Sequence, residues 1–199
     1  MWKSVFKFLA MSLLAIGAAN AQPANTFVNV NPPQPTEPGK VEVLEFFAYT
    51  CPHCAVLEPL IQKWKPTLPS KVAFHQVPVA FNQAMKPFQY FYYGLEAVDR
   101  LDLHTKFFKA LHEEKKRLFT RDAMVDWAVG QGVDRQALID AMNSFGVKSK
   151  VTRADNLTKG YAIQGTPSIA VDGRYVTSPS EAGGYQQTID VATQLIDRS

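Results

Sequence analysis

The chain of 199 residues carries only two cysteines, Cys51 and Cys54, and both lie within one stretch of four residues. Scaffolds held together by disulfides need several cysteine pairs along a short chain, so that class is excluded. A composition of 46% hydrophobic and 20% charged residues is that of a globular protein and excludes disorder and collagen-like repeats. The net charge of +3, with no long basic run, gives no sign of nucleic-acid binding.

The first 21 residues have the pattern of a cleaved signal peptide. Lys3 and Lys7 precede an apolar stretch at 8–19, and Ala19-Asn20-Ala21 offers small residues where a signal peptidase reads the chain. We predict cleavage before Gln22. A retained membrane anchor is the alternative, but a helix of these twelve residues spans only about 18 Å of a roughly 30 Å hydrocarbon layer.

Cleavage would leave 178 of the 199 residues and remove two of the 21 basic side chains, so that 19 basic residues face 18 acidic ones. The mature chain is therefore expected to be an exported protein that is almost neutral. Disulfides persist in oxidising compartments, so a lone Cys-x-x-Cys pair can exist there in either redox state.

The first predicted elements lead directly to the cysteines. A short strand at 27–30 and an extended, proline-containing connector at 31–39 come first. Val41–Phe47 is a nearly continuous apolar run, which is typical of a central strand covered on both faces. A helix is predicted from Pro52, because proline is tolerated in a first turn and apolar residues then recur every four positions. The next strand is predicted at 72–79.

Residues 81–147 are predicted to form an inserted all-helical domain. Helix starts and one break are marked by residues that favour those positions: Pro87, Thr120, Asp134, Gly130 and Gly132. The aromatic segment 88–93 is expected to belong to the core rather than to a peptide groove. His104 and His112, close to the charged run at 113–117, are expected on a solvated helix face.

The last part of the chain returns to a mixed pattern. A helix is predicted at about 147–161, and a β-hairpin at 168–177, where Asp172-Gly173 tolerates the positive φ of a two-residue turn. An amphipathic helix begins at Tyr185. The order of elements predicts an α/β fold with a mixed sheet flanked by helices.

The chemistry is predicted to lie at Cys51-Pro52-His53-Cys54, where the buried strand meets the helix. Unpaired N–H groups and the positive end of the dipole favour an anion at a helix N-terminus, so Cys51 is the expected nucleophile and Cys54 its partner thiol. The dipole contributes about 0.3–2 kcal/mol, whereas each pKa unit needs about 1.4 kcal/mol. A large depression therefore requires direct donors, for which His53 and the amide of Cys54 are the candidates.

The two cysteines have two alternative uses, a zinc site and a structural disulfide. A zinc site needs two more ligands, and the sequence offers no second Cys-x-x-Cys; His75, His104 and His112 are candidates only if the fold brings them to the cysteines. A structural disulfide that closes so short a loop adds little loop-closure entropy.

The segment 44–47, Cys51-Pro52-His53-Cys54, the helical block, residues 143–149 and Thr166-Pro167 before a strand together resemble the DsbA family of bacterial periplasmic thiol:disulfide oxidoreductases. The resemblance covers nearly all of the mature chain. It implies a thioredoxin-like fold, with 22–80 and 148–199 as the thioredoxin-like domain.

This resemblance also implies a function. The Cys51–Cys54 disulfide would be donated to newly exported, cysteine-containing proteins in the periplasm, and a membrane partner of the DsbB type would reoxidise the pair. We expect no bound cofactor or metal, and a monomeric protein. A disulfide reductase on the same fold and a non-enzymatic metallochaperone are the alternatives.

The resemblance assigns roles to single residues. Cys51 is the attacking cysteine, Cys54 its partner, and His53 the residue that tunes the pair. Pro167 matches the family's cis-proline, and Thr166 would present its backbone to an extended substrate, as an added strand requires.

Glu45 is a candidate proton relay to Cys54. It lies in the apolar strand, where a buried carboxyl tends to keep its proton; the alternative is a carboxylate at a strand edge in contact with solvent. Some relatives carry a lysine on the neighbouring strand, where this chain has His75-Gln76-Val77, so a charged Glu-Lys pair is not expected.

Overall fold

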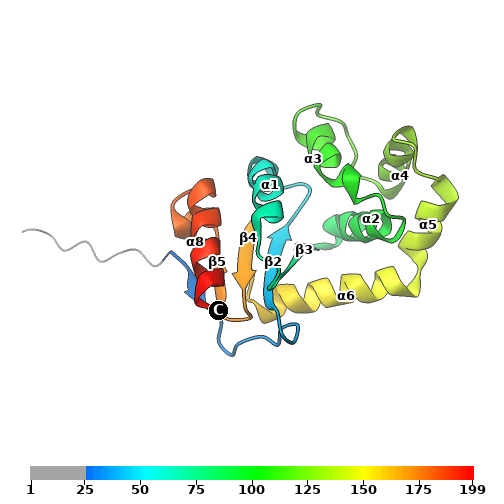
Figure 1. Ribbon diagram of the computed structural model, residues 1–199. Helices are drawn as coiled ribbons and strands as arrows, with labels where there is room; N and C mark the ends of the chain where they lie inside the picture. The colour runs from blue at the N-terminus through cyan, green and yellow to red at the C-terminus, as the bar shows by residue number, and fades with distance from the viewer. Residues whose placement is uncertain (1–25) are drawn as a thin grey trace, which may run out of the picture.

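The computed structural model describes residues 26–199 and contains a five-stranded mixed sheet flanked by helices (Figure 1). The strands are β1 Val28–Asn29, β2 Val41–Phe47, β3 Val72–Pro78, β4 Ser168–Val171 and β5 Tyr175–Thr177. Their order in the sheet is β1-β5-β4-β2-β3. β2 pairs parallel with β3 and antiparallel with β4, and all of its residues are buried, as the apolar run predicts.

Eight α-helices and three single turns of 3-10 helix lie within the described residues. The helices are α1 Pro52–Trp64, α2 Lys86–Ala97, α3 His104–His112, α4 Arg121–Gly130, α5 Arg135–Asn143, α6 Phe145–Gly160, α7 Pro179–Ala182 and α8 Tyr185–Arg198. The 3-10 turns are Lys65–Thr67, Gln83–Met85 and Leu101–Leu103. Side-chain oxygens of Thr120, Asp134 and Ser144 accept a hydrogen bond from the N–H three residues further on, which fixes the starts of α4, α5 and α6.

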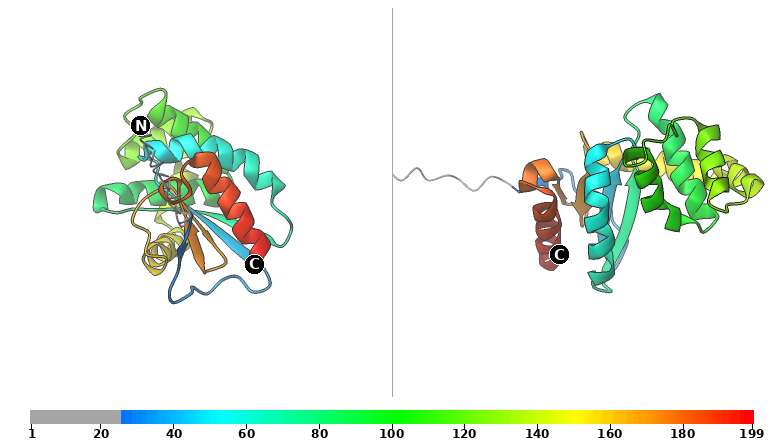
Figure 2. Two further views of the ribbon diagram at one scale, coloured as in Figure 1. Left: turned by 90° about the vertical axis from the view of Figure 1, so that its left-hand side faces the viewer. Right: turned by 90° about the horizontal axis from the view of Figure 1, so that it is seen from above.

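The two faces of the sheet are covered by different helices. Side chains alternate along a strand, so Val41 and Val43 of β2 pack with α1 and α8, whereas Leu44 and Phe46 pack on the opposite face with residues of α6. Figure 2 shows α1 and α8 side by side in front of the sheet. Cys51 is thereby carried to the start of a helix that lies directly on the central strand.

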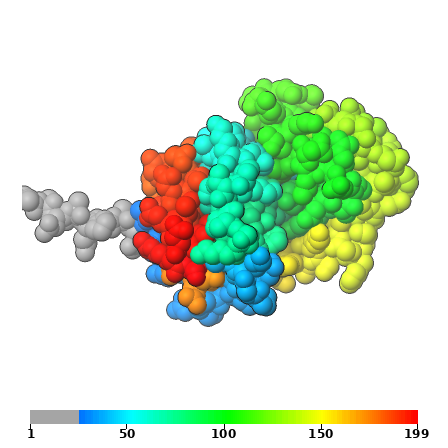
Figure 3. Space-filling model, viewed as in Figure 1, coloured from blue at the N-terminus to red at the C-terminus, as the bar shows by residue number. Residues whose placement is uncertain are grey.

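Helices α2 to α5 form a body beside the sheet, which is the inserted helical part of a thioredoxin-like fold (Figure 3). Its core is aromatic: the Phe107 ring packs on Phe91 and Trp127 at centroid distances of 4.7 and 5.0 Å. The aromatic segment of α2 lies in this core, as expected. Helix α6 then returns the chain to the sheet, and the predicted domain boundary at 147/148 falls within its first turn.

Two sequence expectations need correction. His104 is not on a solvated face: it is 2% exposed, because it lies on the same stripe of α3 as Phe107, Phe108 and Leu111. Helix α6 begins two residues earlier than expected, because the hydroxyl of Ser144 caps it. The short helix α7 was not predicted, although Ser178 and Glu181 have the spacing of a capping box.

The predicted cleavage site before Gln22 lies outside the described residues. Within residues 26–199, the helices are all too short or too polar to cross a membrane.

The β4–β5 turn generates a stability prediction. Gly173 has φ +68°, and a Cβ built there would lie 2.1 Å from the carbonyl oxygen of Gln34. Gly173→Ala is therefore expected to lower the free energy of unfolding by roughly 2–4 kcal/mol, as measured by urea denaturation, through left-handed strain and overpacking.

Gly130→Ala is the matched control. A Cβ at Gly130 would meet no atom within 4 Å, and the residue is helical, so the same measurement should give a change of less than about 1 kcal/mol. Equal stabilities of the two variants would contradict the assigned strain at Gly173.

Candidate functional site

The candidate site lies where β2 ends and α1 begins. Cys51 is the N-cap of α1, with φ −86° and ψ 117°, and Pro52 follows as the first helical residue. Proline has no N–H, so the first free donors of the helix belong to His53 and Cys54. Both cysteines are free thiols; Cys51 is half-buried and Cys54 is buried.

The pKa values of the two thiols are shifted in opposite directions. Hydrogen bonds from the Cys54 thiol, from Thr166 and from the backbone N–H groups of Cys54 and His53 together outweigh burial and lower the pKa of Cys51 to about 5. Burial, and the hydrogen bond that it gives to Cys51, raise the pKa of Cys54 far above its usual range. At neutral pH, Cys51 is therefore a thiolate and Cys54 keeps its proton.

The loop before β4 lies next to Cys51, because β4 is the antiparallel neighbour of β2. The Cys51 Sγ lies 3.1 Å from the carbonyl oxygen of Thr166, which can accept a hydrogen bond from Cys51 only while that thiol is protonated. The peptide bond between Thr166 and Pro167 is cis, as the resemblance implies. The structure thus brings Cys51 and Thr166-Pro167 together, although 115 positions separate the hydrogen-bonded residues.

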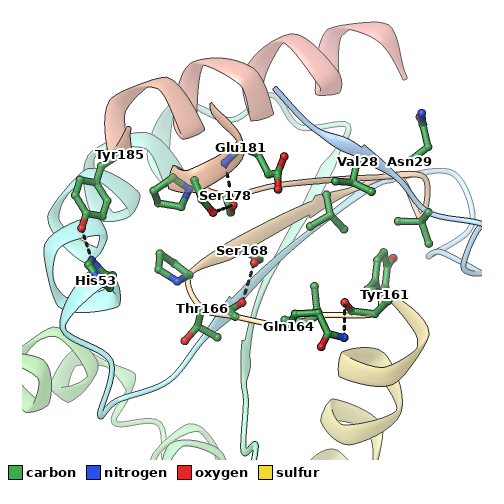
Figure 4. Close-up of a pocket in the computed structure, with 18 of the residues that line it drawn as sticks. Val28, Asn29, His53, Tyr161, Gln164, Thr166, Ser168, Ser178, Glu181 and Tyr185 are labelled. Atoms are coloured by element: carbon green, nitrogen blue, oxygen red, sulfur yellow. Dashed lines mark hydrogen bonds between the residues drawn. The ribbon is translucent and has the colours of Figure 1, made fainter. Parts of the chain in front are cut away.

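The side chain of His53 is directed elsewhere. Its Nδ1 lies 2.6 Å from the hydroxyl of Tyr185 at the start of α8 (Figure 4). Of the two donors expected for Cys51, the amide of Cys54 is present, whereas His53 contributes its backbone N–H and not its ring. Tyr185 was missed by the sequence analysis, because only tertiary packing brings α8 beside α1.

A groove of about 830 Å³ lies beside the turn that carries His53, and its lining includes Thr166 and Pro167 (Figure 4). Its walls come from segments far apart in the sequence: β1, the end of α6 with the loop to Pro167, α7, and the start of α8. His53, Thr166 and Pro167 line it at the end nearest Cys51. One end of the groove is therefore formed by Thr166, whose carbonyl oxygen is 3.1 Å from the Cys51 Sγ.

Glu45 lies at the start of a buried polar network. It is 1% exposed, and the Nε2 of Gln76 donates to its carboxyl at 2.8 Å. Burial, reinforced by the charge of Glu58, raises the pKa of Glu45 to about 8 despite that hydrogen bond. The buried alternative for Glu45 is therefore confirmed, and its carboxyl holds a proton at neutral pH.

Glu58 and His104 complete this network. The same Nε2 of Gln76 lies 3.1 Å from the Nε2 of His104, which is 3.4 Å from Glu58, and the Tyr49 hydroxyl lies 2.8 Å from the Nδ1 of His104. Burial alone would raise the pKa of Glu58, but the hydrogen bond and charge of His104, with the Thr105 hydroxyl, hold it below its usual value. The sequence analysis missed this partnership.

The comparisons with known proteins agree with this geometry. Residues 36–191 match a family described as thioredoxin. The thiol:disulfide interchange protein DsbA of Bordetella parapertussis is 51% identical over 193 residues, which cover 96% of this chain and 92% of that protein. This chain belongs to the DsbA family. It is therefore a thiol:disulfide oxidoreductase.

Solved DsbA structures have the same fold. The crystal structure of Pseudomonas aeruginosa DsbA matches with a TM-score of 0.83 at 35% identity, covering 87% of this chain and 92% of that one. DsbA from Xylella fastidiosa matches with a TM-score of 0.80 at 28% identity, covering 87% and 94%. The thioredoxin-like fold with a helical insert is thus shared by the DsbA family members and this chain.

The raised pKa of Glu45 predicts how the stability of the fold depends on pH. The folded protein keeps a proton on Glu45 up to about pH 8, whereas the unfolded chain releases it near 4.5, so stability falls as pH rises between these values. Glu45→Gln should remove this loss. The free energy of unfolding of the variant should therefore rise relative to that of the parent protein by roughly 1 kcal/mol for each pH unit in this range. Urea denaturation of the reduced protein from about pH 5 to 8 measures it.

Glu113→Gln serves as the control, because Glu113 is exposed and should leave the pH dependence of the parent unchanged. If the Glu45→Gln and parent stabilities ran parallel over this range, Glu45 would have to be ionised in the folded protein, and the assignment of a buried neutral carboxyl would be wrong.

Proposed function

We propose that this protein is a periplasmic disulfide oxidase that donates a Cys51–Cys54 disulfide to newly exported proteins with free thiols. The observation that carries the proposal is the lowered pKa of Cys51, about 5, beside a partner whose pKa is raised. A stabilised thiolate favours the reduced pair, and a pair that favours reduction gives its disulfide away.

The transfer takes place in two exchanges. A substrate thiolate attacks the Cys51 sulfur, the Cys51–Cys54 bond breaks, and Cys54 leaves with the electron pair and takes up a proton. A second substrate thiolate then attacks the substrate sulfur of the mixed disulfide, and Cys51 leaves as its stabilised thiolate. The substrate has lost two electrons and gained a disulfide, and the enzyme pair holds both electrons.

We assign substrate binding to His53, Thr166 and Pro167 at the end of the groove nearest Cys51. The Thr166 carbonyl accepts the Cys51 thiol proton in the structure, but Cys51 has no such proton as a thiolate or in a disulfide. The carbonyl is then available to a backbone N–H of an extended substrate, which binds as an added strand. Contacts of this kind are independent of substrate sequence and suit many exported proteins.

Glu45 is proposed as the proton relay. Its carboxyl is protonated at neutral pH, so it has a proton to give when Cys54 leaves as a thiolate. Glu58 lies four residues after Cys54 on the same buried face of α1, so the polar network begins one helical turn from the leaving cysteine. The side chain that contacts Glu45 from the neighbouring strand is Gln76 and not a lysine, and His104, 3.1 Å from the same amide, supplies the basic group.

The remaining parts of the proposal follow from family membership. A signal peptide ending at residue 21 would direct the chain to the periplasm, with 22–80 and 148–199 as the thioredoxin-like domain and 81–147 as the insert. The chain has only two cysteines, so an outside oxidant, proposed as a membrane partner of the DsbB type, must restore the disulfide. We propose that the protein acts as a monomer.

The metallochaperone alternative has little support. Across residues 26–199, no three or more His, Cys, Asp or Glu side chains are grouped to hold a metal ion. The three histidines considered as extra ligands have other neighbours: His75 faces Glu37, His104 faces Glu58, and His112 lies against the carbonyl of Tyr49. A reductase on the same fold differs only in redox poise, which the following experiment measures.

Equilibration with glutathione tests the direction of transfer. The reduced protein is expected to predominate at glutathione ratios that keep thioredoxin-like reductants oxidised, because the Cys51 thiolate is stabilised. Thiolate absorbance should titrate near pH 5 in the parent protein and should be absent from Cys51→Ser. An oxidised form that is the more stable partner would reverse the proposed direction.

Cys54→Ser tests which of the two cysteines forms the mixed disulfide with a substrate. Cys51 can still exchange with an oxidised peptide, but the mixed disulfide has no second thiol in the enzyme, so a covalent complex should accumulate and be seen by mass spectrometry. Cys51→Ser is the matched control and should form far less, because the remaining Cys54 is buried and protonated. Equal trapping by the two variants would contradict the assignment of Cys51 as the nucleophile.

A further inference from the structure

His53 and Tyr185 form a hydrogen-bonded pair next to the reactive cysteine. The His53 Nδ1 and the Tyr185 hydroxyl are 2.6 Å apart, and the two rings lie within 27° of parallel. His53 comes from the first turn of α1 and Tyr185 from the first turn of α8. Figure 4 shows the hydroxyl directed at the imidazole beside the groove.

The contact to Tyr185 is the one hydrogen bond of the His53 ring within the described residues. His53 is exposed, and the ring that stacks near its imidazole also belongs to Tyr185. The groups that lower the pKa of Cys51 include the His53 backbone N–H but not its imidazole. The hydroxyl of Tyr185 therefore determines where the imidazole lies.

Tyr185 is presented by a rigid element. The buried face of α8, including Ile189, Ala192 and Leu195, packs into the cluster that covers the sheet. Before it, α7 ends at Gly183 with φ +86°, a conformation that favours glycine and turns the chain into α8. The hydroxyl is thus held at a fixed position relative to α1.

We propose that Tyr185 is a positioning residue that holds the His53 imidazole away from Cys51 and so limits the stabilisation of the thiolate. This inference rests on the proposed function, in which that thiolate sets the redox poise. An imidazole N–H donates a strong hydrogen bond to a thiolate, because the acceptor is charged. Without the Tyr185 hydroxyl, the His53 ring is free to turn toward Cys51, two residues earlier in the chain.

Tyr185→Phe tests this with the loss of a single oxygen. The pKa of Cys51 should fall, and the equilibrium constant with glutathione should shift toward the reduced protein by roughly threefold to tenfold, the effect of one hydrogen bond. The variant would be a stronger oxidant than the parent. Thiolate absorbance against pH and the glutathione equilibrium measure the two effects independently.

Two controls separate this role from a general structural one. Tyr175→Phe removes a hydroxyl from β5, outside the groove, and should leave both values unchanged. In a His53→Ser background, Tyr185→Phe should cause no further shift, because the hydroxyl acts only through the imidazole. A shift of the same size in that background would overturn the proposal.

An unchanged pKa and equilibrium in Tyr185→Phe, or a shift toward the oxidised form, would also overturn it. Failure of the proposed function is distinguishable, since it would appear as a parent protein that does not oxidise a dithiol peptide. The shift between parent and Tyr185→Phe can be measured whichever direction the parent prefers.

Discussion

The antiparallel pairing of β2 with β4 is the constraint on which the site depends. Phe46 lies opposite Ser168 in this register, so the residues that follow β2 meet the residues that precede β4. Cys51 and Thr166 come within hydrogen-bond distance for that reason. A slip of one residue would also turn Glu45 from the face beneath α1 to the opposite face, because side chains alternate along a strand. One register thus places the reactive sulfur, its loop and the buried acid.

The difference between the two cysteines follows from three residues of helix. Cys51 lies at the N-terminus of α1, where N–H groups have no partner within the helix, and it receives their hydrogen bonds. Cys54 lies one turn further on, where burial opposes charge and its protonated thiol donates a hydrogen bond to Cys51. The same short motif therefore contains a good leaving group and a poor one, which makes exchange at Cys51 directional.

Local patterns were sufficient to predict much of this from the sequence. The apolar run at 41–47 and the proline at position 52 identify β2 and α1, because both signals act over a few residues. Contacts between distant segments were not predictable: 132 positions separate His53 from Tyr185. For His104 a local signal did exist, since its spacing to Phe107, Phe108 and Leu111 marks the buried face. The charged run at 113–117 led to the wrong prediction of a solvated face for His104, because those residues lie beyond the end of α3.

The contact of His104 with Glu58 joins the helical insert to the sheet domain through two buried polar side chains, whose Nε2 and carboxyl oxygen are 3.4 Å apart. Removing His104 would leave the Glu58 carboxylate buried without this partner, and an uncompensated buried charge costs about 3–5 kcal/mol. The helical insert therefore cannot be exchanged between relatives as a whole without also matching its contact with α1. A substitution at His104 of α3 is therefore expected to require a matching substitution at Glu58 of α1, so the insert and the sheet domain constrain one another at this contact.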